Sequence, residues 1–413
     1  MARTAIIGAG VIGLTLGHQL ARRGDEVVIV DQRRPGAGAS IGNAGWVTPS
    51  LSVPVAAPGL VWTALKWMAD PNSPLYIKPR LDPNFIRWLL SFMWHCRQED
   101  FEASSQALLD LSRGTNEAFD ELLEQGVSFE MSEAGLMMLA FDEDLLDHHL
   151  EMSPDLSTIG YMKLRRLSRA ETHEMEPALS DEVAGAIYAQ DDRHVHPASF
   201  VDGLVRALLE AGVEIKSETR VDSFDRSGRN VGALQTNQGR IEADRFVIAA
   251  GAWTGKLAKK AGFYLPIEAG KGYSITIDNP SVKLKYPLDL LDVRAAVTPF
   301  GDQLRFAGTM ELSGINLKYR KNRVEAIWRN AHRYLRERVT GDRMRSWVGM
   351  RPMTPDGVPV LGRMPGSDNL YVATGHQMLG VTLAATTALA MAKLMNGEDP
   401  GFNLAPFDPL RFA

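Results

Sequence analysis

Apolar and polar residues occur in distinct blocks at the start of the chain. A short apolar run over residues 4–7 ends in glycines, residues 11–23 carry apolar positions at helical spacing, and a second apolar run over residues 27–30 ends at Asp31. Continuous apolar runs are typical of strands buried on both faces, and a spacing of 3.6 residues is typical of an amphipathic helix. The pattern predicts a strand–turn–helix–strand unit within about 30 residues.

The same periodicities predict mixed elements along the rest of the chain. We expect mainly helical structure over residues 62–125, strands over 131–141, and a helix over 200–211 that ends at Gly212. The elements expected after it are a strand (213–215), a hairpin (231–241), a buried strand (246–250), alternating strands (275–306), a helix (324–339), a last strand (369–374) and a last helix (375–395).

The turn after the first strand reads Gly8-Ala9-Gly10-Val11-Ile12-Gly13, a G-x-G-x-x-G motif. Its glycines allow a tight turn, close approach of the backbone to a pyrophosphate and close helix–strand packing. The helix N-terminus offers free N–H groups to phosphates, and Asp31 can accept hydrogen bonds from both ribose hydroxyls. A glycine-rich turn without ligand is the alternative, but the flanking strand, helix and acid favour a dinucleotide site. The motif does not distinguish FAD from NAD.

These elements indicate an α/β protein with a Rossmann-type domain that is discontinuous in sequence and an inserted α+β domain with a mixed sheet. Nucleotide-type segments occur at the start, near residues 200–255 and at the end of the chain. The predicted division assigns 1–58, 196–262 and 343–413 to the nucleotide-binding domain, and 59–195 and 263–342 to the substrate or cap domain.

Composition narrows the possible partners. The chain has 413 residues, 45% hydrophobic and 23% charged, with a net charge of −5 and a pI of about 6.0. This acidic balance argues against a nucleic-acid partner. The single cysteine, Cys96, excludes an intrachain disulfide and favours a reducing compartment. We expect a cytoplasmic protein, because Gly8, Gly10 and Gly13 interrupt the N-terminal apolar stretch, which therefore does not read as a signal peptide. The longest weakly polar stretch, 378–392, is shorter than the roughly 20 residues of a membrane span and is expected to be a core helix.

Further motifs follow in order along the chain. They are residues 39–45 (ASIGNAG), 56–59 (AAPG), 66–67 (KW), 249–253 (AAGAW), 270–274 (GKGYS), 349–357 (GMRPMTPDG) and 373–376 (ATGH). With these motifs the chain resembles the D-amino-acid oxidase superfamily of flavoenzymes, which includes glycine oxidase and sarcosine oxidase. It is most similar to the D-amino-acid dehydrogenase branch, through residues 39–45 and 349–357, and the resemblance covers nearly the whole chain.

The resemblance implies a non-covalently bound FAD. Cys96 lies far in sequence from the flavin motifs, so it does not support the cysteinyl attachment seen in sarcosine oxidases. The residues implied to bind FAD are Gly8, Gly10, Val11, Ile12, Gly13, Asp31, Gln32, Ser40, Asn43, Ala44, Gly45, Trp46, Val47, Arg220, Val221, Ala250, Gly251, Trp253, Gly375, His376, Gln377, Met378, Leu379, Gly380, Val381 and Thr382. Within the last eight, we expect a helix N-terminus that stabilises the negative charge of the reduced flavin.

Three residues are candidates for the chemistry. Arg351 is expected to clamp a substrate carboxylate, since the arginine fork matches a carboxylate bidentately; the alternative is a salt bridge to Asp356. Tyr273 is expected either to face the substrate or to pack in the core. His376 is expected either to contact flavin or substrate as a neutral imidazole at a helix N-terminus, or to cap that helix.

Two other groups of residues leave alternatives open. His194 and His196 with Asp191 and Asp192 would suit a metal, but Pro197 follows directly and no metal is expected. The tryptophans are expected to pack in the core of inserted helices, or else to form an exposed face for a membrane or quinone partner. Such contact would place the protein peripherally, at the inner face of a membrane. The tryptophans concerned are Trp62, Trp67, Trp88 and Trp94.

The leading hypothesis is an FAD enzyme that deaminates a small D-amino acid or cyclic D-imino acid, such as D-proline or hydroxy-D-proline, by hydride transfer from the α-carbon to flavin N5. The bulky run Gln377-Met378-Leu379 motivates the cyclic substrate, and oxygen or quinone is the expected acceptor of electrons. The alternatives are an oxidase of glycine, sarcosine or other N-substituted glycines that produces hydrogen peroxide, a non-catalytic flavin-binding protein, and an NAD-linked dehydrogenase.

Overall fold

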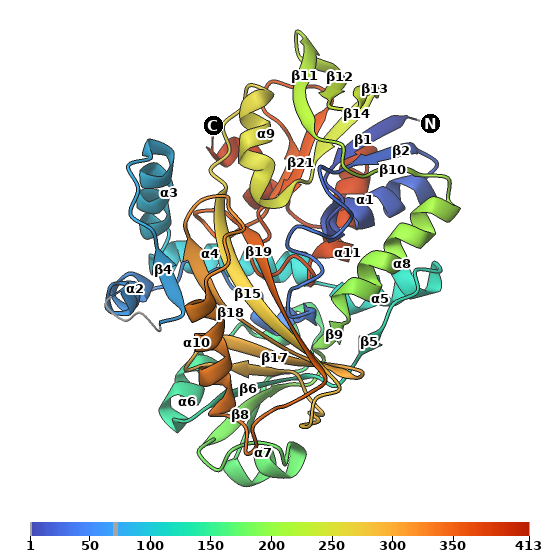
Figure 1. Ribbon diagram of the computed structural model, residues 1–413. Coiled ribbons are helices and arrows are strands. Elements are labelled where there is room, and N and C mark those ends of the chain that lie inside the picture. Colours follow the sequence, from blue (N-terminus) through green and yellow to red (C-terminus); the bar gives the residue numbers. More distant parts are fainter. Residues whose placement is uncertain (1, 69–72, 413) are drawn as a thin grey trace.

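The computed structural model describes residues 2–68 and 73–412. Its first layer is a six-stranded sheet in the order β10-β2-β1-β14-β21-β20. Its strands are β1 (Arg3–Ile7), β2 (Glu26–Val30), β10 (Glu214–Lys216), β14 (Arg245–Ile248), β20 (Val360–Arg363) and β21 (Leu370–Thr374). The first five in the order pair in parallel, and β20 pairs with β21 antiparallel. The sheet thus joins strands from both ends and the middle of the chain (Figure 1).

Strand alternation gives this sheet two apolar faces. Ile6 and Ile29 face one way, toward a core shared with the helices of that side, whereas Ala5 and Val28 face the other. The helices on the first side are α1 (Val11–Arg22), α4 (Gln98–Ser112), α5 (Thr115–Glu124), α8 (Pro197–Glu210) and α11 (Ala384–Met395). The second face is covered by β11 (Val221–Ser227), β12 (Asn230–Thr236), β13 (Gly239–Glu242) and α9 (Thr254–Lys260).

A nine-stranded mixed sheet forms the second layer, which lies below the first in Figure 1. Its strands are β4 (Leu75–Ile77), β6 (Leu136–Ala140), β7 (Arg165–Leu167), β8 (Gly185–Ala189), β15 (Glu268–Asp278), β16 (Leu288–Leu290), β17 (Ala295–Phe300), β18 (Gln303–Leu312) and β19 (Arg343–Met353). Helix α10 (Lys321–His332) packs on one face; α6 (Glu143–Glu151) and α7 (Arg169–Met175) lie at the far end. A small sheet of β3 (Trp46–Val47), β9 (Arg193–Val195) and β5 (Met131–Ser132) lies between the layers.

The architecture confirms the predicted fold class, a discontinuous Rossmann-type sheet with a second, mixed sheet. The exact division into domains stays a prediction; β19, within the range 343–413 assigned to the nucleotide-binding domain, pairs with β15 in the larger sheet. Two predicted helices have wrong bounds: the helix expected over 375–395 begins at Ala384, and the helix expected over 324–339 spans Lys321–His332. Gly375 and Gln377 adopt positive φ angles of 82° and 48°, which are incompatible with a right-handed helix.

The tryptophans do not share one environment. Trp88 is buried on α3 (Pro83–Trp94), but Trp94 of the same helix and Trp62 of α2 (Leu60–Met68) are exposed, and Trp67 is half-buried. Core packing is therefore the outcome for Trp88 but not for Trp62 or Trp94. Within the described parts of the chain, no helix combines the length and apolar character that crossing a bilayer requires.

Candidate functional site: a dinucleotide cavity

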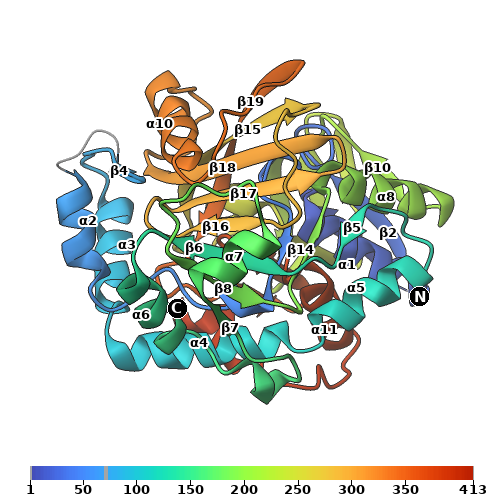
Figure 2. The same ribbon diagram turned by 90° about the horizontal axis from the view of Figure 1, so that it is seen from below.

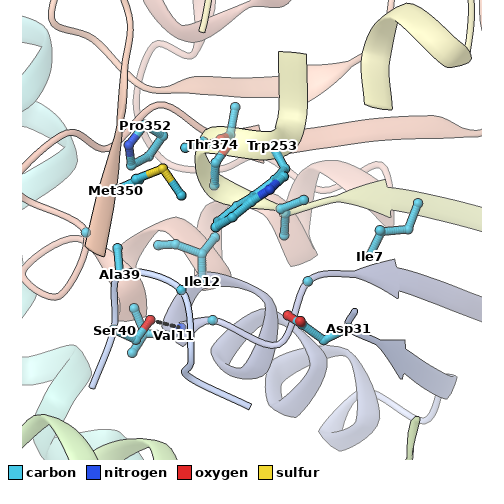
Figure 3. A pocket seen from close by; sticks show the side chains of 18 of the residues that line it. Ile7, Val11, Ile12, Asp31, Ala39, Ser40, Trp253, Met350, Pro352 and Thr374 are labelled. Carbon is cyan, nitrogen blue, oxygen red and sulfur yellow. Dashed lines mark hydrogen bonds between the residues drawn. The ribbon is translucent and has the colours of Figure 1, made fainter. Parts of the chain in front are cut away.

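A cavity of about 330 Å³ lies at the carboxyl ends of β1, β2, β14 and β21 and extends to β19. Figure 3 shows Met350 and Pro352 across the cavity from Val11 and Asp31. Nineteen of the residues implied to bind FAD or to act in catalysis line it: Gly8, Gly10, Val11, Ile12, Asp31, Gln32, Ser40, Asn43, Arg220, Val221, Ala250, Gly251, Trp253, Arg351, His376, Gln377, Met378, Gly380 and Val381.

The glycine turn is shaped by close backbone packing. Gly8 has a φ of 119°, and a β-carbon there would lie 2.4 Å from the Ala249 carbonyl oxygen. A β-carbon at Gly13 would lie 1.9 Å from the Gly8 carbonyl oxygen, so Gly13 does not line the cavity but lets α1 approach β1. Gly10 is the N-cap of α1, where free N–H groups face the cavity. The turn therefore supplies the close approach that a pyrophosphate needs.

Two polar side chains fix the edges of this turn. Ser40 Oγ accepts a hydrogen bond from the Val11 N–H over 3.1 Å, drawn in Figure 3. Asp31 accepts one from the Ala9 N–H and one from the Arg33 N–H, each at 2.8 Å. Burial raises the pKa of Asp31 above its usual value, while the two N–H donors oppose the shift. The carboxylate is thus held in one orientation at the end of β2.

The opposite wall carries a buried cation. Arg351 of β19 donates from Nη1 to the Thr309 carbonyl oxygen over 3.0 Å, and among the described residues no carboxylate lies within ion-pairing distance of it. The alternative partner, Asp356, instead accepts from Arg411 Nε over 2.7 Å. Burial lowers the pKa of Arg351 to about 10, so the guanidinium stays charged at neutral pH. An unpaired buried cation in a cavity calls for an anionic ligand.

His376 and Gln377 add unpaired polar atoms to the same wall. His376 Nε2 lies 3.0 Å from Thr387 Oγ1 of α11, and its Nδ1 has no partner in the described structure. Burial lowers the pKa of His376 to about 3, so the imidazole is neutral as expected, although its backbone forms an isolated β-bridge with Met353 rather than a helix N-terminus. Gln377 Nε2 donates to Thr354 Oγ1 over 3.2 Å, which leaves Oε1 without a partner.

Tyr273 lies outside the cavity and is buried in the core, which is the second of its two expected placements and not the one beside the substrate. On β15 it points to the face opposite Gly272, toward α10, where its hydroxyl donates to Glu311 Oε2 over 3.0 Å. Glu311 also pairs with Lys271 at 2.8 Å, and both are fully buried. The strand period of two residues explains the placement, because Gly272 is the residue that adjoins Arg351.

Several other expected contacts also lie beside the cavity rather than on it. Trp46 and Val47 belong to β3, and the Trp46 indole N–H donates to Thr298 Oγ1 over 2.8 Å. Thr382 donates to the Trp46 carbonyl oxygen over 3.1 Å and so fastens this strand. Leu379 is buried in the core that α11 shares with α1. The residues concerned are Ala44, Gly45, Trp46, Val47, Gly375, Leu379 and Thr382.

Sequence reasoning missed part of the lining. The missed residues include Ile7, Val30, Arg33, Gly38, Ala39, Thr219, Ala249, Ala252, Lys256, Leu257, Lys260, Met350, Pro352, Ala373 and Thr374. Many of them flank the recognised motifs, and a rule that the carboxyl ends of parallel strands face the ligand would have found Ile7, Val30 and Thr374. Lys256 and Lys260, on α9, carried no such signal.

The residues considered for a metal have other partners. His194 Nε2 lies 3.0 Å from the Pro299 carbonyl oxygen, and His196 caps α8 by accepting from the Ser199 N–H over 3.1 Å. Asp192 is buried and accepts from the backbone and hydroxyl of Ser50. Among residues 2–68 and 73–412, no group of three histidine, cysteine or acidic residues has an arrangement suited to a metal ion.

The fold and the cavity define a dinucleotide-binding oxidoreductase, and comparison with known proteins specifies the family. The model of the FAD-dependent oxidoreductase family matches residues 3–394, and the chain belongs to this family. D-amino acid dehydrogenase of Methylobacterium radiotolerans is 32% identical over 404 residues, 96% of each chain. That of Granulibacter bethesdensis is 29% identical over the whole of both. Glycine oxidase from Geobacillus kaustophilus has a similar structure, with a TM-score of 0.76, 26% identity and coverage of 99% and 98%.

The cofactor of this family is FAD, and the residues present fit it. Gly8 and Gly13 allow the backbone packing that shapes the turn at the cavity, Asp31 is preoriented for a ribose, and the unpaired atoms of His376 and Gln377 offer hydrogen bonds at the other end. Family and cofactor confirm the resemblance drawn from the sequence and exclude the NAD-linked alternative.

Proposed function

We propose that the protein oxidises a small D-amino acid or cyclic D-imino acid, such as D-proline or hydroxy-D-proline. The observation that carries the proposal is Arg351, a cation that lines the FAD cavity without a carboxylate partner in the described structure. A carboxylate-bearing substrate supplies the missing charge, and the planar fork of arginine binds it bidentately. The names of the relatives, D-amino acid dehydrogenases at 29% and 32% identity, support the same substrate class.

The side chains around Arg351 have distinct roles in this proposal. Arg351 holds the carboxylate and so fixes which α-hydrogen faces the cofactor. The neutral His376 and the Gln377 carbonyl accept hydrogen bonds, which suits an amine or a cofactor N–H. Met350 and Pro352 line the adjoining wall with apolar surface and exclude water. FAD, when bound, supplies the acceptor for the hydride of the α-carbon.

The lining of the cavity favours a compact substrate, but only two of the three residues 377–379 contribute to it. Gln377 and Met378 line the cavity, whereas Leu379 is turned into the core behind it. Met350 and Pro352 provide the apolar bulk that Leu379 does not. A ring such as that of proline presents a small apolar surface to this wall. A preference for D-arginine would contradict this part of the proposal.

An oxidase of glycine, sarcosine or another N-substituted glycine is the second candidate. The structural similarity to glycine oxidase favours it, since the two chains are 26% identical over almost their full lengths. The same Arg351 would bind its substrate, so the two candidates differ in the group on the α-carbon and in the electron acceptor. Oxygen as acceptor gives hydrogen peroxide, while a quinone gives none.

Anaerobic bleaching of the flavin absorbance tests both candidates. The panel holds D-alanine, D-proline, cis-4-hydroxy-D-proline, D-arginine, glycine, sarcosine and the L-enantiomers. Bleaching by one D-compound but not its L-form is the expected result, and bleaching by glycine or sarcosine with peroxide formation in air supports the second candidate. A yellow protein that no compound bleaches would contradict both and favour a non-catalytic flavin-binding protein.

A further inference from the structure

A second buried arginine of the larger sheet lacks a carboxylate partner. Arg305 of β18 is 6% exposed, and among the described residues no carboxylate lies within ion-pairing distance of it. Asp278, which lies on the same face of the neighbouring strand β15, pairs with Arg345 instead. A buried cation without a counter-ion costs free energy, so its charge calls for another partner.

The guanidinium of Arg305 holds the segment 39–45, which we call the cofactor loop because part of it lines the FAD cavity. Arg305 Nη1 donates to the carbonyl oxygen of Asn43 over 2.7 Å and to that of Ile41 over 3.2 Å. Its Nε donates to Thr276 Oγ1 on β15 over 2.9 Å. Figure 2 shows β15 and β18 side by side in the larger sheet. The arginine therefore ties the cofactor loop to two neighbouring strands.

The carbonyl group between these two is bound from the same sheet. Ser274 Oγ of β15 donates to the Gly42 carbonyl oxygen over 2.8 Å, so three successive carbonyl groups of the loop face the larger sheet. In a trans peptide the N–H group points opposite to the C=O group. The N–H groups of Gly42, Asn43 and Ala44 therefore face away from the sheet, and they have no acceptor among the described residues. Successive free N–H groups of this kind attract negative charge.

We infer that Arg305 is a positioning residue of the FAD site: it holds the carbonyl groups of the cofactor loop so that the N–H groups of the same peptides face the cofactor. A cation on the carbonyl side also polarises the N–H groups on the other side. FAD gains negative charge on reduction, and fixed donors that face a developing charge stabilise it. Arg305 therefore strengthens FAD binding and makes the bound FAD easier to reduce. This role depends on the FAD site and not on the proposed substrate.

Close packing keeps the cofactor loop seated on the larger sheet. A β-carbon at Gly42 would lie 2.1 Å from Cδ2 of the Trp347 indole, on β19. The indole itself lies against Gly349, where a β-carbon would be 1.8 Å from its Cη2. The indole therefore has no room to retreat, and a side chain at residue 42 would displace the loop without changing any charge.

Two measurements on the intact protein test this role. Titration of the apoprotein with FAD, followed by flavin fluorescence, gives the Kd, and equilibration of the FAD-loaded protein with a redox dye gives the midpoint potential. We expect Arg305→Met to raise the Kd for FAD by roughly tenfold to a hundredfold, the value of one charge-assisted hydrogen bond, and to make the midpoint potential more negative. Arg305→Lys keeps the charge but loses the fork, so its Kd should rise less and its potential should stay closer to that of wild type.

Two further variants separate the charge of Arg305 from the position of the loop. Arg345→Met is the matched control, because it removes the same charge from the same face of the sheet, where the arginine is exposed and paired with Asp278. It should change neither the Kd nor the potential. Gly42→Ala should raise the Kd for FAD, because the loop is displaced while Arg305 and its charge remain.

The opposite results overturn the inference. Wild-type values of both the Kd and the potential in Arg305→Met would exclude the role, as would equal changes in Arg345→Met. A raised Kd with an unchanged potential would leave Arg305 as a structural link between the two layers. If circular dichroism shows that Arg305→Met does not fold, Arg305→Lys decides, and a Kd equal to that of wild type would contradict the inference. Neither measurement uses an amino acid, so a failure of the proposed function affects neither.

Discussion

The guanidinium of Arg351 is held by the backbone carbonyl of Thr309, at 3.0 Å from Nη1. Thr309 has a φ of 61°, in the left-handed region that a β-branched residue rarely adopts. Thr309 lies within the register shift between β15 and β18, because Lys271 pairs with Glu311 and Tyr273 pairs with Gly308. The irregularity turns a carbonyl out of the ladder and toward the arginine. A strained backbone residue thus holds the side chain that we expect to bind the substrate carboxylate.

Replacement of Arg351 tests the carboxylate clamp. We expect Arg351→Met to lower kcat/KM by about 10²-fold, because a charge-assisted hydrogen-bonded pair contributes about 1.5–3 kcal/mol. Arg351→Lys should retain part of the activity, since it keeps the charge but loses the bidentate fork. Steady-state kinetics with the best D-substrate measure both, and flavin absorbance shows whether the cofactor is retained. Full activity of Arg351→Met would exclude the clamp.

Gly272 tests the placement of that side chain without removing it. A β-carbon at Gly272 would lie 2.3 Å from Arg351 Nη1, so Gly272→Ala should displace the guanidinium. We expect kcat/KM to fall by about 10²-fold, as for a misplacement of about 1 Å. The melting temperature should change little, because the displaced atoms end a flexible side chain. Gly232→Ala is the matched control, since the nearest atom there is 3.9 Å away.

Asp31→Asn tests the orientation of the ribose acceptor. The carboxylate accepts from the N–H groups of Ala9 and Arg33, and an amide can accept with only one of its two terminal atoms. We expect the Kd for FAD to rise by roughly tenfold to a hundredfold, the value of one charge-assisted hydrogen bond. Titration of the apoprotein by flavin fluorescence measures it. An unchanged Kd would show that Asp31 is not part of the cofactor site.

The buried carboxyl of Asp192 should make the free energy of unfolding depend on pH. Burial raises the pKa of Asp192 to about 7 from an unfolded value of 3.8, so the folded state binds more protons between these values. Its contribution to the free energy of unfolding is therefore greatest below pH 3.8 and is lost as the pH rises to 7. Asn at this position does not titrate. Between pH 5 and 7 we expect Asp192→Asn to gain about 1.4 kcal/mol per pH unit relative to wild type.

Urea denaturation at pH 5, 6 and 7 measures this difference for both proteins. The buried histidines contribute equally to both and cancel in the comparison. A difference that does not change with pH would mean that the Asp192 carboxyl keeps its usual pKa in the folded protein.

The sequence predicted those parts of the site that depend on contiguous residues. The turn from Gly8 to Gly13 and the acid Asp31 form one local unit, whose geometry follows from where glycine is required. Arg351 was predicted by resemblance, and the structure adds that no carboxylate pairs with it among the described residues. The placement of Tyr273 stayed open between cavity and core, because the face that a strand residue occupies is set by how the strand pairs with its neighbours, here β18 and β19.

Two other predictions, the start of the last helix and the burial of the tryptophans, depend on features that helical periodicity does not report. Residues 375–383 lead into the following helix without a proline or an acidic or basic side chain other than His376, but positive φ angles at Gly375 and Gln377 fold them into turns. The spacing of apolar residues carries no information on φ angles, and in a sequence only a glycine indicates that a positive φ is favourable. Likewise, Trp88 and Trp94 have similar sequence surroundings, yet one is buried and the other exposed. Which side of an apolar helix is covered depends on Met353, more than 250 positions away.

The order of strands in the six-stranded sheet has a consequence for biosynthesis. Strand β14 lies between β1 and β21 in the sheet, and β21 follows β14 by about 120 residues in the chain. A ribosome releases these strands in sequence, so β14 has an open edge until β21 has emerged, and such edges invite aggregation. Because Ala373 and Thr374 of β21 line the cofactor cavity, a nascent chain that stops before β21 has an incomplete site for the flavin.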